Sequence, residues 1–422
     1  MGRSIPKSVC IDGIKSTGPG GSPEERVYEY EIDLITPMYG GGVVAGVNEQ
    51  ERPIRVPSIR GQLRFWWRAT RGTAFTSLEE LKKREAEIWG STEKASPTWV
   101  GVSCDPYNKD KVRERAANYG FERYGPETYA LFPAVNNGQN LVKEGLKFTV
   151  SLRCLKEHEV DVQCAVWAWV NFGGLGARTR KGCGVLFCKE LAPQNAQTFG
   201  TWLKERLQRY EVRSSPIEDL PHVSRKVLFG PEERASLAAW STGLSAIKDF
   251  RQRPGLARSL GDLHPGRSYW PEPDTIRRAL NHPASPHKPD PNKPDGFPRA
   301  LFGLPIVFHF MNKGDPSTEA YPKGKKRMAS PLIIRPIGTQ DGQFLPLALF
   351  LDGTCPREVE LKGSAASFGA SQIVNPKFAS YDKSPMGKPE KCSSKEKRSS
   401  KGDALEAFRA YLKEKGYEGV SL

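Results

Sequence analysis

One loop-forming stretch dominates the sequence and follows directly on an apolar, helix-like run: Gly173-Gly174-Leu175-Gly176-Ala177-Arg178-Thr179-Arg180-Lys181-Gly182-Cys183-Gly184. Its twelve residues include five glycines and three cations. Glycine adopts positive φ and has no Cβ, so another backbone can lie against the main chain and N–H groups can turn toward an anion. Arginine and lysine add charge and donors suited to phosphate. The candidate binding residues of this loop are Gly174, Gly176, Arg178, Arg180, Lys181, Gly182 and Gly184.

Two common nucleotide-binding motifs do not fit this loop. A dinucleotide fingerprint that starts at Gly174 needs Gly or Ala where Thr179 stands. A Walker loop needs Gly-Lys followed by Ser or Thr, but Lys181 precedes Gly182. Two interpretations remain: a loop that binds nucleic acid or phosphate, and a glycine-rich β-turn whose charges are solvated.

A second cationic segment spans residues 57–71, and its spacing predicts an amphipathic helix with Ser58 as N-cap. Four arginines fall within about 80° of one another on that helix; they are Arg60, Arg64, Arg68 and Arg71. The neighbouring apolar face is expected to be buried; it consists of Ile59, Leu63, Trp66 and Thr70. No glutamate between residues 52 and 78 offsets the repulsion, so Arg60, Arg64 and Arg68 are candidates for phosphate contact.

The order of the predicted elements favours an α+β fold. Residues 27–35 and 146–155 alternate apolar and polar side chains as strands do, while 161–172 has the composition of a buried helix. With the arginine helix and a short strand after the glycine loop, this gives the order of a ferredoxin-like domain. The first strand runs into a second glycine-rich loop, residues 36–42, where Tyr39 is expected to be exposed and able to stack on a base.

The second half of the chain predicts another α+β domain. Helices are expected at 231–250 and 403–415, and strands at 299–310, 330–337 and 345–351, the last two paired as a hairpin. Two tracts, 282–298 and 383–401, lack any core-forming pattern. We therefore expect one domain over residues 25–210 and a second over 211–422, with loop and helical insertions.

Composition limits the class of protein. The 422 residues carry a net charge of +15, which favours a polyanionic partner. No apolar run is long enough to span a membrane and the first residues do not form a signal peptide, so a cytoplasmic protein is expected. The eight cysteines contain no CxxC pair, so neither a metal site nor a cofactor is expected.

These motifs together resemble a known family. Residues 59–69 look like the signature near the start of the RAMP proteins of type III CRISPR systems, and Gly174-x-Gly176-x5-Gly182-x-Gly184 is similar to the glycine-rich loop of the RAMP superfamily. The tandem tryptophans and the segments 302–305 and 329–332 most resemble the first subunit of the Cmr module of type III-B effector complexes. The resemblance implies two tandem ferredoxin-like, RNA-recognition-type domains, and as partners the guide RNA near its 3′ end, the target RNA and other RAMP subunits.

Three functions follow from these observations. The first is non-catalytic RNA binding in antiviral defence, with sequence specificity left to guide pairing. The second is a metal-independent endoribonuclease that processes guide RNA, which needs a general acid/base histidine; none of the six histidines lies within either basic motif. The third is an assembly protein whose charges serve protein interfaces, which a steep salt dependence of RNA affinity would distinguish from the first. We expect no second glycine-rich loop in residues 211–422.

Overall fold

The computed structural model describes residues 24–49, 52–104, 113–254, 256–258, 266–281, 287–291, 295–310, 312, 314–353, 355–364, 366–373 and 403–420. The first half of the chain forms a four-stranded antiparallel sheet of order β3-β6-β1-β7. Its strands are β1 Glu25–Leu34, β3 Trp99–Cys104, β6 Lys147–Leu155 and β7 Leu186–Phe187. Along β1, Tyr30, Ile32 and Leu34 are buried while the residues between them reach solvent, as the alternation in the sequence predicts.

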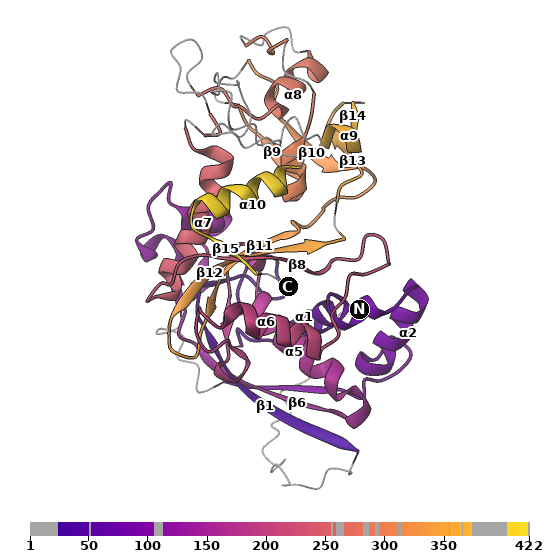
Figure 1. The fold of residues 1–422 in the computed structure, drawn as a ribbon. Helices are drawn as coiled ribbons and strands as arrows, with labels where there is room; N and C mark the ends of the chain where they lie inside the picture. Colours follow the sequence, from indigo (N-terminus) through magenta and orange to yellow (C-terminus); the bar gives the residue numbers. More distant parts are fainter. Residues whose placement is uncertain are drawn as a thin grey trace, which may run out of the picture.

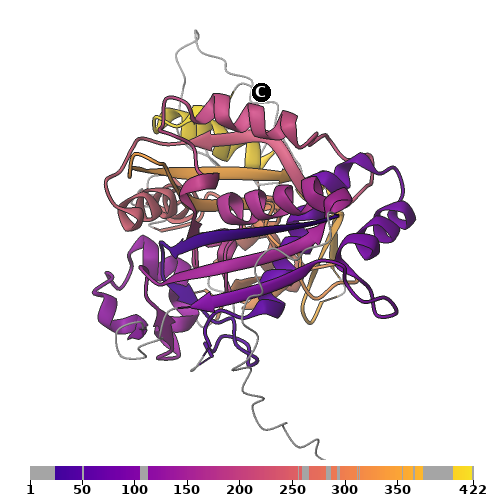
Figure 2. The ribbon, with the colours of Figure 1, turned by 90° about the horizontal axis from the view of Figure 1, so that it is seen from below.

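Helices cover one face of this sheet, as Figures 1 and 2 show. They are α1 Val56–Arg68, α2 Leu78–Trp89, α5 Glu159–Phe172 and α6 Phe199–Arg209. The apolar face predicted for α1 is buried, and α1 packs against α5. The prediction that Ser58 caps α1 is wrong: Arg55 is the N-cap and Pro57 stands in the first turn, where its fixed φ suits a helix.

The second half forms a four-stranded antiparallel sheet of order β11-β12-β8-β15. Its strands are β8 His222–Phe229, β11 Leu332–Gly338, β12 Phe344–Asp352 and β15 Glu418–Gly419, and its helices are α7 Ser236–Gln252 and α10 Ala404–Glu414. Both halves therefore have a strand-helix-strand-strand-helix-strand core with the same strand order relative to the chain. The predicted hairpin is confirmed, because β11 pairs with β12 from Leu332 opposite Phe350 to Gly338 opposite Phe344.

Each half carries insertions. The first contributes a three-stranded sheet and one helix: β2 Met38–Tyr39, β4 Arg113–Arg115, β5 Asn140–Val142 and α4 Pro126–Asn136. The second contributes a further four-stranded sheet with two helices: β9 Ile306–Phe308, β10 Thr318–Pro322, β13 Glu358–Leu361, β14 Ser367–Gly369, α8 Glu272–Leu280 and α9 Ala370–Ile373.

The predicted strand over residues 299–310 is confirmed only for Ile306–Phe308. Pro298–Phe302 forms a 3₁₀ turn, and only β9 is extended. β9 pairs with β10 of the inserted sheet rather than with the hairpin strands. Gly303 separates the two pieces at φ +107°, a conformation that breaks regular structure and that glycine tolerates.

The layers alternate from the bottom of Figure 1 upward: the first sheet, helices α1, α5 and α6, the second sheet, helices α7 and α10, and the inserted sheet. The second sheet is buried on both faces. Leu347 and Leu349 of β12 join the core of the first half, whereas Ala348 and Phe350 pack on the side of α7 and α10. Alternate side chains of a strand point to opposite faces, so one strand serves two cores. This is why β12 is apolar from Phe344 to Leu351, and why β11 is apolar on both sides of Arg335.

Some predictions lie outside the described residues, namely the tract 383–401, the lead-in 1–23 and most of residues 282–294. Among the helices of the described ranges, none combines the length and the apolar character needed to cross a membrane.

Candidate nucleic-acid interface

The two glycine-rich loops lie against each other. The Ala177 amide donates to the Tyr39 carbonyl oxygen at 2.6 Å, and the Gly184 amide donates to the Pro37 carbonyl oxygen at 2.9 Å. The Thr36 hydroxyl donates to the Gly182 carbonyl oxygen at 2.8 Å. The loop after β1 and the loop after α5 are therefore held together by hydrogen bonds between their backbones.

The glycines are required by this internal contact. A Cβ on Gly176 would lie 2.5 Å from the Tyr39 carbonyl oxygen, one on Gly184 would lie 2.0 Å from the Leu175 carbonyl oxygen, and one on Gly174 would lie 2.7 Å from the Gly184 carbonyl oxygen. A Cβ on Gly182 would lie 2.7 Å from the indole of Trp240, which belongs to α7. The predicted close approach thus exists, and in the structure the approaching atoms belong to the protein itself.

The three loop cations are half-buried and point to different neighbours. Arg178, at φ +59°, donates to the Ala130 carbonyl oxygen at 2.9 Å. Arg180 donates to the Ser330 carbonyl oxygen, and burial lowers its pKa to about 10. The Lys181 ammonium lies 5.3 Å from the centroid of the Tyr129 ring. Among the described residues, none of these three cations forms an ion pair with a carboxylate.

The arginine stripe of α1 has internal partners. The Arg64 and Arg68 guanidinium groups lie 2.6 and 2.5 Å from the same Glu85 carboxylate oxygen, on α2. Arg60 donates to the backbone carbonyl oxygens of Trp89 and Thr98. For Arg64 and Arg68 the counter-charge is Glu85, which belongs to a different helix, so the local sequence around α1 does not reveal it. A role in phosphate contact for Arg60, Arg64 and Arg68 stays a prediction, and these bonds compete with it.

The prediction that Tyr39 is exposed is wrong. Its side chain is 7% exposed and packs with Leu141 and Ala130 in a core that includes residues of the three-stranded sheet and of α4. The reason is that Tyr39 belongs to β2, which pairs with β5, so its ring is enclosed by the insertion. The ring is not free to stack on a base in this structure.

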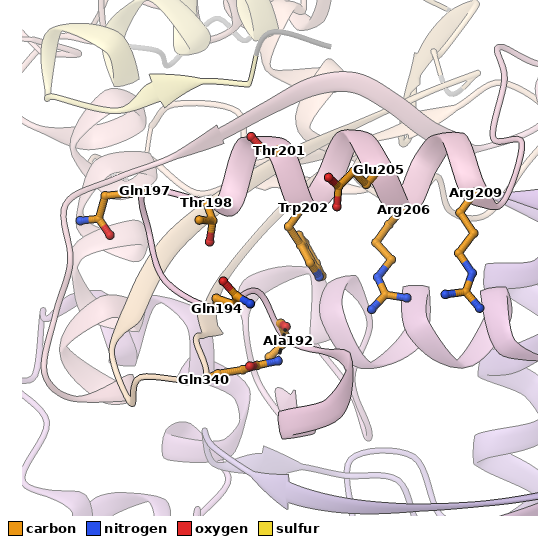
Figure 3. Close-up of a pocket in the computed structure, with 10 residues that line it drawn as sticks. All are labelled: Ala192, Gln194, Gln197, Thr198, Thr201, Trp202, Glu205, Arg206, Arg209 and Gln340. Carbon is orange, nitrogen blue, oxygen red and sulfur yellow. Dashed lines mark hydrogen bonds between the residues drawn. The ribbon is translucent and has the colours of Figure 1, made fainter.

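A groove of about 600 Å³ lies along α6 (Figure 3). Trp202, Arg206 and Arg209 project from the helix toward the same side, and Gln194 and Gln340 lie across from Trp202. The Gln340 side chain donates to the carbonyl oxygens of Lys189 and Ala192, so it ties the hairpin between β11 and β12 to the first half. The sequence does not predict this groove, because Gln340 in its opposite wall comes from a distant hairpin.

No histidine of the described ranges forms a hydrogen bond with the glycine-rich loop. His158 and His222 are buried, and His222 accepts from the Ser215 amide at 3.3 Å. His287 lies 2.9 Å from an Asp315 carboxylate oxygen, and His309 is exposed. His264 and His282 are outside the described residues. Within the described ranges no group of histidine, cysteine and carboxylate residues is arranged to hold a metal ion.

Residues 31–186 match the family model of the RAMP superfamily. The chain is 25% identical over 178 residues to CRISPR system Cmr subunit Cmr1-2 of Pyrococcus furiosus, a match that covers 37% of this chain and 92% of that protein. It is 29% identical over 163 residues to CRISPR system Cmr subunit Cmr1-1 of the same organism, and this match spans 37% of this chain and about half of the relative, 46%.

Two solved structures are also similar. The crystal structure of apo Cmr1 from Pyrococcus furiosus aligns with 19% identity and a TM-score of 0.49, over 79% of this chain and 90% of that chain. A chain of the type III-B Cmr-beta complex bound to cognate target RNA aligns with 12% identity and a TM-score of 0.48, over 78% of this chain and 94% of that chain.

The part of the chain that carries the glycine loop and the arginine-tryptophan helix is thus similar to the RAMP superfamily. The relatives that it matches are named as Cmr1 subunits of CRISPR systems, so the resemblance inferred from the sequence is confirmed.

Proposed function

We propose that this chain is a non-catalytic RNA-binding subunit of a type III-B CRISPR ribonucleoprotein effector. In this role it contacts the guide RNA near its 3′ end, the target RNA, or both, and other RAMP subunits of the complex. Its relatives carry the names of Cmr subunits, and the net charge of +15 suits a polyanionic partner.

The proposal includes two tandem ferredoxin-like domains. The support is the strand order, which is β3-β6-β1-β7 in the first sheet and β11-β12-β8-β15 in the second. In both sheets the first strand along the chain lies between the third and the fourth, and the second strand is at the edge beside the third. The domains differ in the segment before the last strand. In the first half it is the long glycine-rich loop, whereas in the second only residues 415–417 separate α10 from β15.

One observation carries the proposal: Arg178 and Lys181 stand on the glycine loop without a carboxylate partner in the described residues, whereas elsewhere in the fold Arg71 pairs with Asp161 and Arg299 pairs with Glu272. Two cations kept unpaired on a rigid backbone unit are suited to hold phosphates by charge alone. Contacts of this kind read the RNA backbone and leave the choice of sequence to base pairing. Because these cations position the RNA and transfer no proton, the proposed role is binding and not catalysis.

The test is a salt titration of the full chain with a fluorescein-labelled 20-nucleotide single-stranded RNA in EDTA. The variant is Arg178→Gln/Lys181→Gln, and the control is Lys82→Gln/Lys83→Gln, which removes two exposed charges from α2. Loss of two phosphate contacts should reduce the slope of log affinity against log salt by about 1.4. The control should retain the slope. Absence of binding by the wild-type chain would overturn the RNA-binding role, and shortening of the RNA on a gel would overturn its non-catalytic character.

A further inference from the structure

Three cations from two halves of the chain converge on one phenol. Arg251, at the end of α7, donates to the Tyr129 hydroxyl at 2.9 Å. Lys181 lies against the face of the same ring, 5.3 Å from its centroid. Arg178 is bonded to the carbonyl oxygen of the next residue, Ala130. α4, the glycine loop and α7 thus meet around Tyr129, and α4 packs directly on α7 at the left of Figure 1.

Within the part of the chain that the structure describes, the cluster lacks the carboxylate that accompanies cations elsewhere in the fold. Arg299 pairs with Glu272 at 3.2 Å, and Arg277 pairs with Asp315 at 3.0 Å. Among the described residues Arg178, Lys181 and Arg251 form no such pair. Burial lowers the pKa of Lys181, and the positive charges of Arg251 and Arg178 lower it further. Burial and mutual repulsion disfavour the charged form of Lys181. Clusters of like charge of this kind are typical of a site that binds an anion.

We propose that Arg251 and Tyr129 join Arg178 and Lys181 in a composite site for neighbouring backbone phosphates of single-stranded RNA, so that the second half of the chain contacts the RNA directly. This inference rests on the RNA-binding role proposed above. One phosphate lies beside the Tyr129 hydroxyl, where the Arg251 guanidinium and the Lys181 ammonium donate to it. The Tyr129 hydroxyl, which accepts from Arg251, donates its own proton to a phosphate oxygen.

Exposed aromatic rings beside the cluster favour a single strand as its ligand. Phe132, one turn along α4 from Tyr129, is half exposed, and the Arg178 guanidinium carbon lies 4.6 Å from its ring centroid. Tyr124, just before α4, is 75% exposed and carries Arg123 at 5.4 Å from its ring centroid. Aromatic and guanidinium planes next to a phosphate site stack on unpaired bases of any sequence.

The experiment compares Arg251→Gln with Arg253→Gln in the full chain. Arg253 is two residues away and pairs with Asp249, so its loss removes the same charge outside the cluster. With the labelled 20-nucleotide RNA, Arg251→Gln should weaken binding about five- to tenfold at low salt and reduce the salt slope by about 0.7, the contribution of one phosphate on a single strand. Arg253→Gln should leave the slope unchanged.

The outcomes separate the two proposals. If the wild-type chain does not bind RNA, the proposed function itself fails. If it binds RNA and Arg251→Gln behaves as Arg253→Gln does, the RNA-binding role stands and the composite site is wrong. Arg251→Lys guards against a folding artefact, because it keeps the charge and loses the fork. It should recover the salt slope, and a slope that stays reduced with an unchanged melting temperature would also contradict the site.

Discussion

The Nη1 atom of Arg335 lies 2.6 Å from the carbonyl oxygen of Gly173, which joins β11 of the second half to the first residue of the glycine-rich loop. The same guanidinium donates to the carbonyl oxygens of Val170 and Leu186. It thereby satisfies acceptors at the C-terminal end of α5 that the helix leaves open. The side chain is buried, and burial lowers the pKa of Arg335.

Arg335→Met should strongly destabilise the protein. The substitution keeps much of the volume but leaves four carbonyl oxygens without this donor, the three of the first half and that of Pro336. The cost is about 3 kcal/mol or more in the free energy of unfolding. Thermal denaturation followed by circular dichroism measures the effect. Arg327→Met is the control, since Arg327 is exposed. Equal melting temperatures for the two variants would mean that Arg335 does not hold the halves together.

Gly176→Ala should disrupt the contact between the two glycine loops. Gly176 has φ +79°, and a Cβ there would lie 2.5 Å from the Tyr39 carbonyl oxygen. Gly138→Ala is a matched control because Gly138 has φ +60° with open space around it. Both variants suffer the strain of positive φ, about 1 kcal/mol, but only Gly176→Ala adds a backbone clash, so it should lose about 2 kcal/mol more in urea denaturation. Equal losses would show that the loops separate without cost.

Glu85→Ala should destabilise the fold through its two arginine partners. Glu85 is buried and accepts from both Arg64 and Arg68, which are themselves about one-third exposed. A double-mutant cycle of Glu85→Ala with Arg64→Ala should give a coupling of about 1 kcal/mol, because solvent screens the exposed side of the pair.

The same variants distinguish the two roles of the α1 stripe. If these arginines serve packing alone, Arg64→Ala should lower the melting temperature and leave the salt slope of RNA binding unchanged. A smaller slope in the folded Arg64→Ala variant would instead support the phosphate contact predicted from the sequence.

RNA affinity should fall between pH 7 and 9 through Tyr129. Burial alone would raise the pKa of Tyr129, but Arg251, Lys181 and Arg178 outweigh it and lower that pKa to about 8. The phenolate formed above pH 8 neutralises part of the cluster and repels phosphate. Tyr129→Phe should remove this part of the pH dependence in a binding titration, and identical profiles for both proteins would contradict it.

Folding stability should respond to Tyr129 in the opposite direction. Because the pKa of this acid is lower in the folded chain than the ordinary value of 10.0, the contribution to stability grows as the pH rises from about 8 toward 10 and is lost as the pH falls through 8. Urea denaturation of wild type and Tyr129→Phe at pH 7 and 9.5 measures the difference. A stability gap that does not widen at the higher pH would show that the cations do not reach the phenol.

The sequence alone determined the order of elements and the resemblance to the RAMP superfamily. Period-two alternation identified β1 and β6, helical spacing identified α1, and composition identified α5. The glycine pattern identified the RAMP loop. These signals depend on residues close together in the chain. It also located the loop cations, although not what surrounds them. Their role in RNA binding, and the limits drawn at residues 210 and 211, stay predictions.

Only the tertiary structure decided which charges remain unpaired. In the sequence Arg64 and Arg68 have no nearby acidic residue, but in the structure they pair with Glu85 of α2. Nothing in the sequence distinguishes Arg251 from other arginines, but in the structure it donates to Tyr129. Tyr39 looked exposed until an insertion a hundred residues later enclosed it. The physical reason is the same in each case. Charge compensation and burial depend on distances in space between segments far apart in the chain, and local periodicity carries no information about those distances.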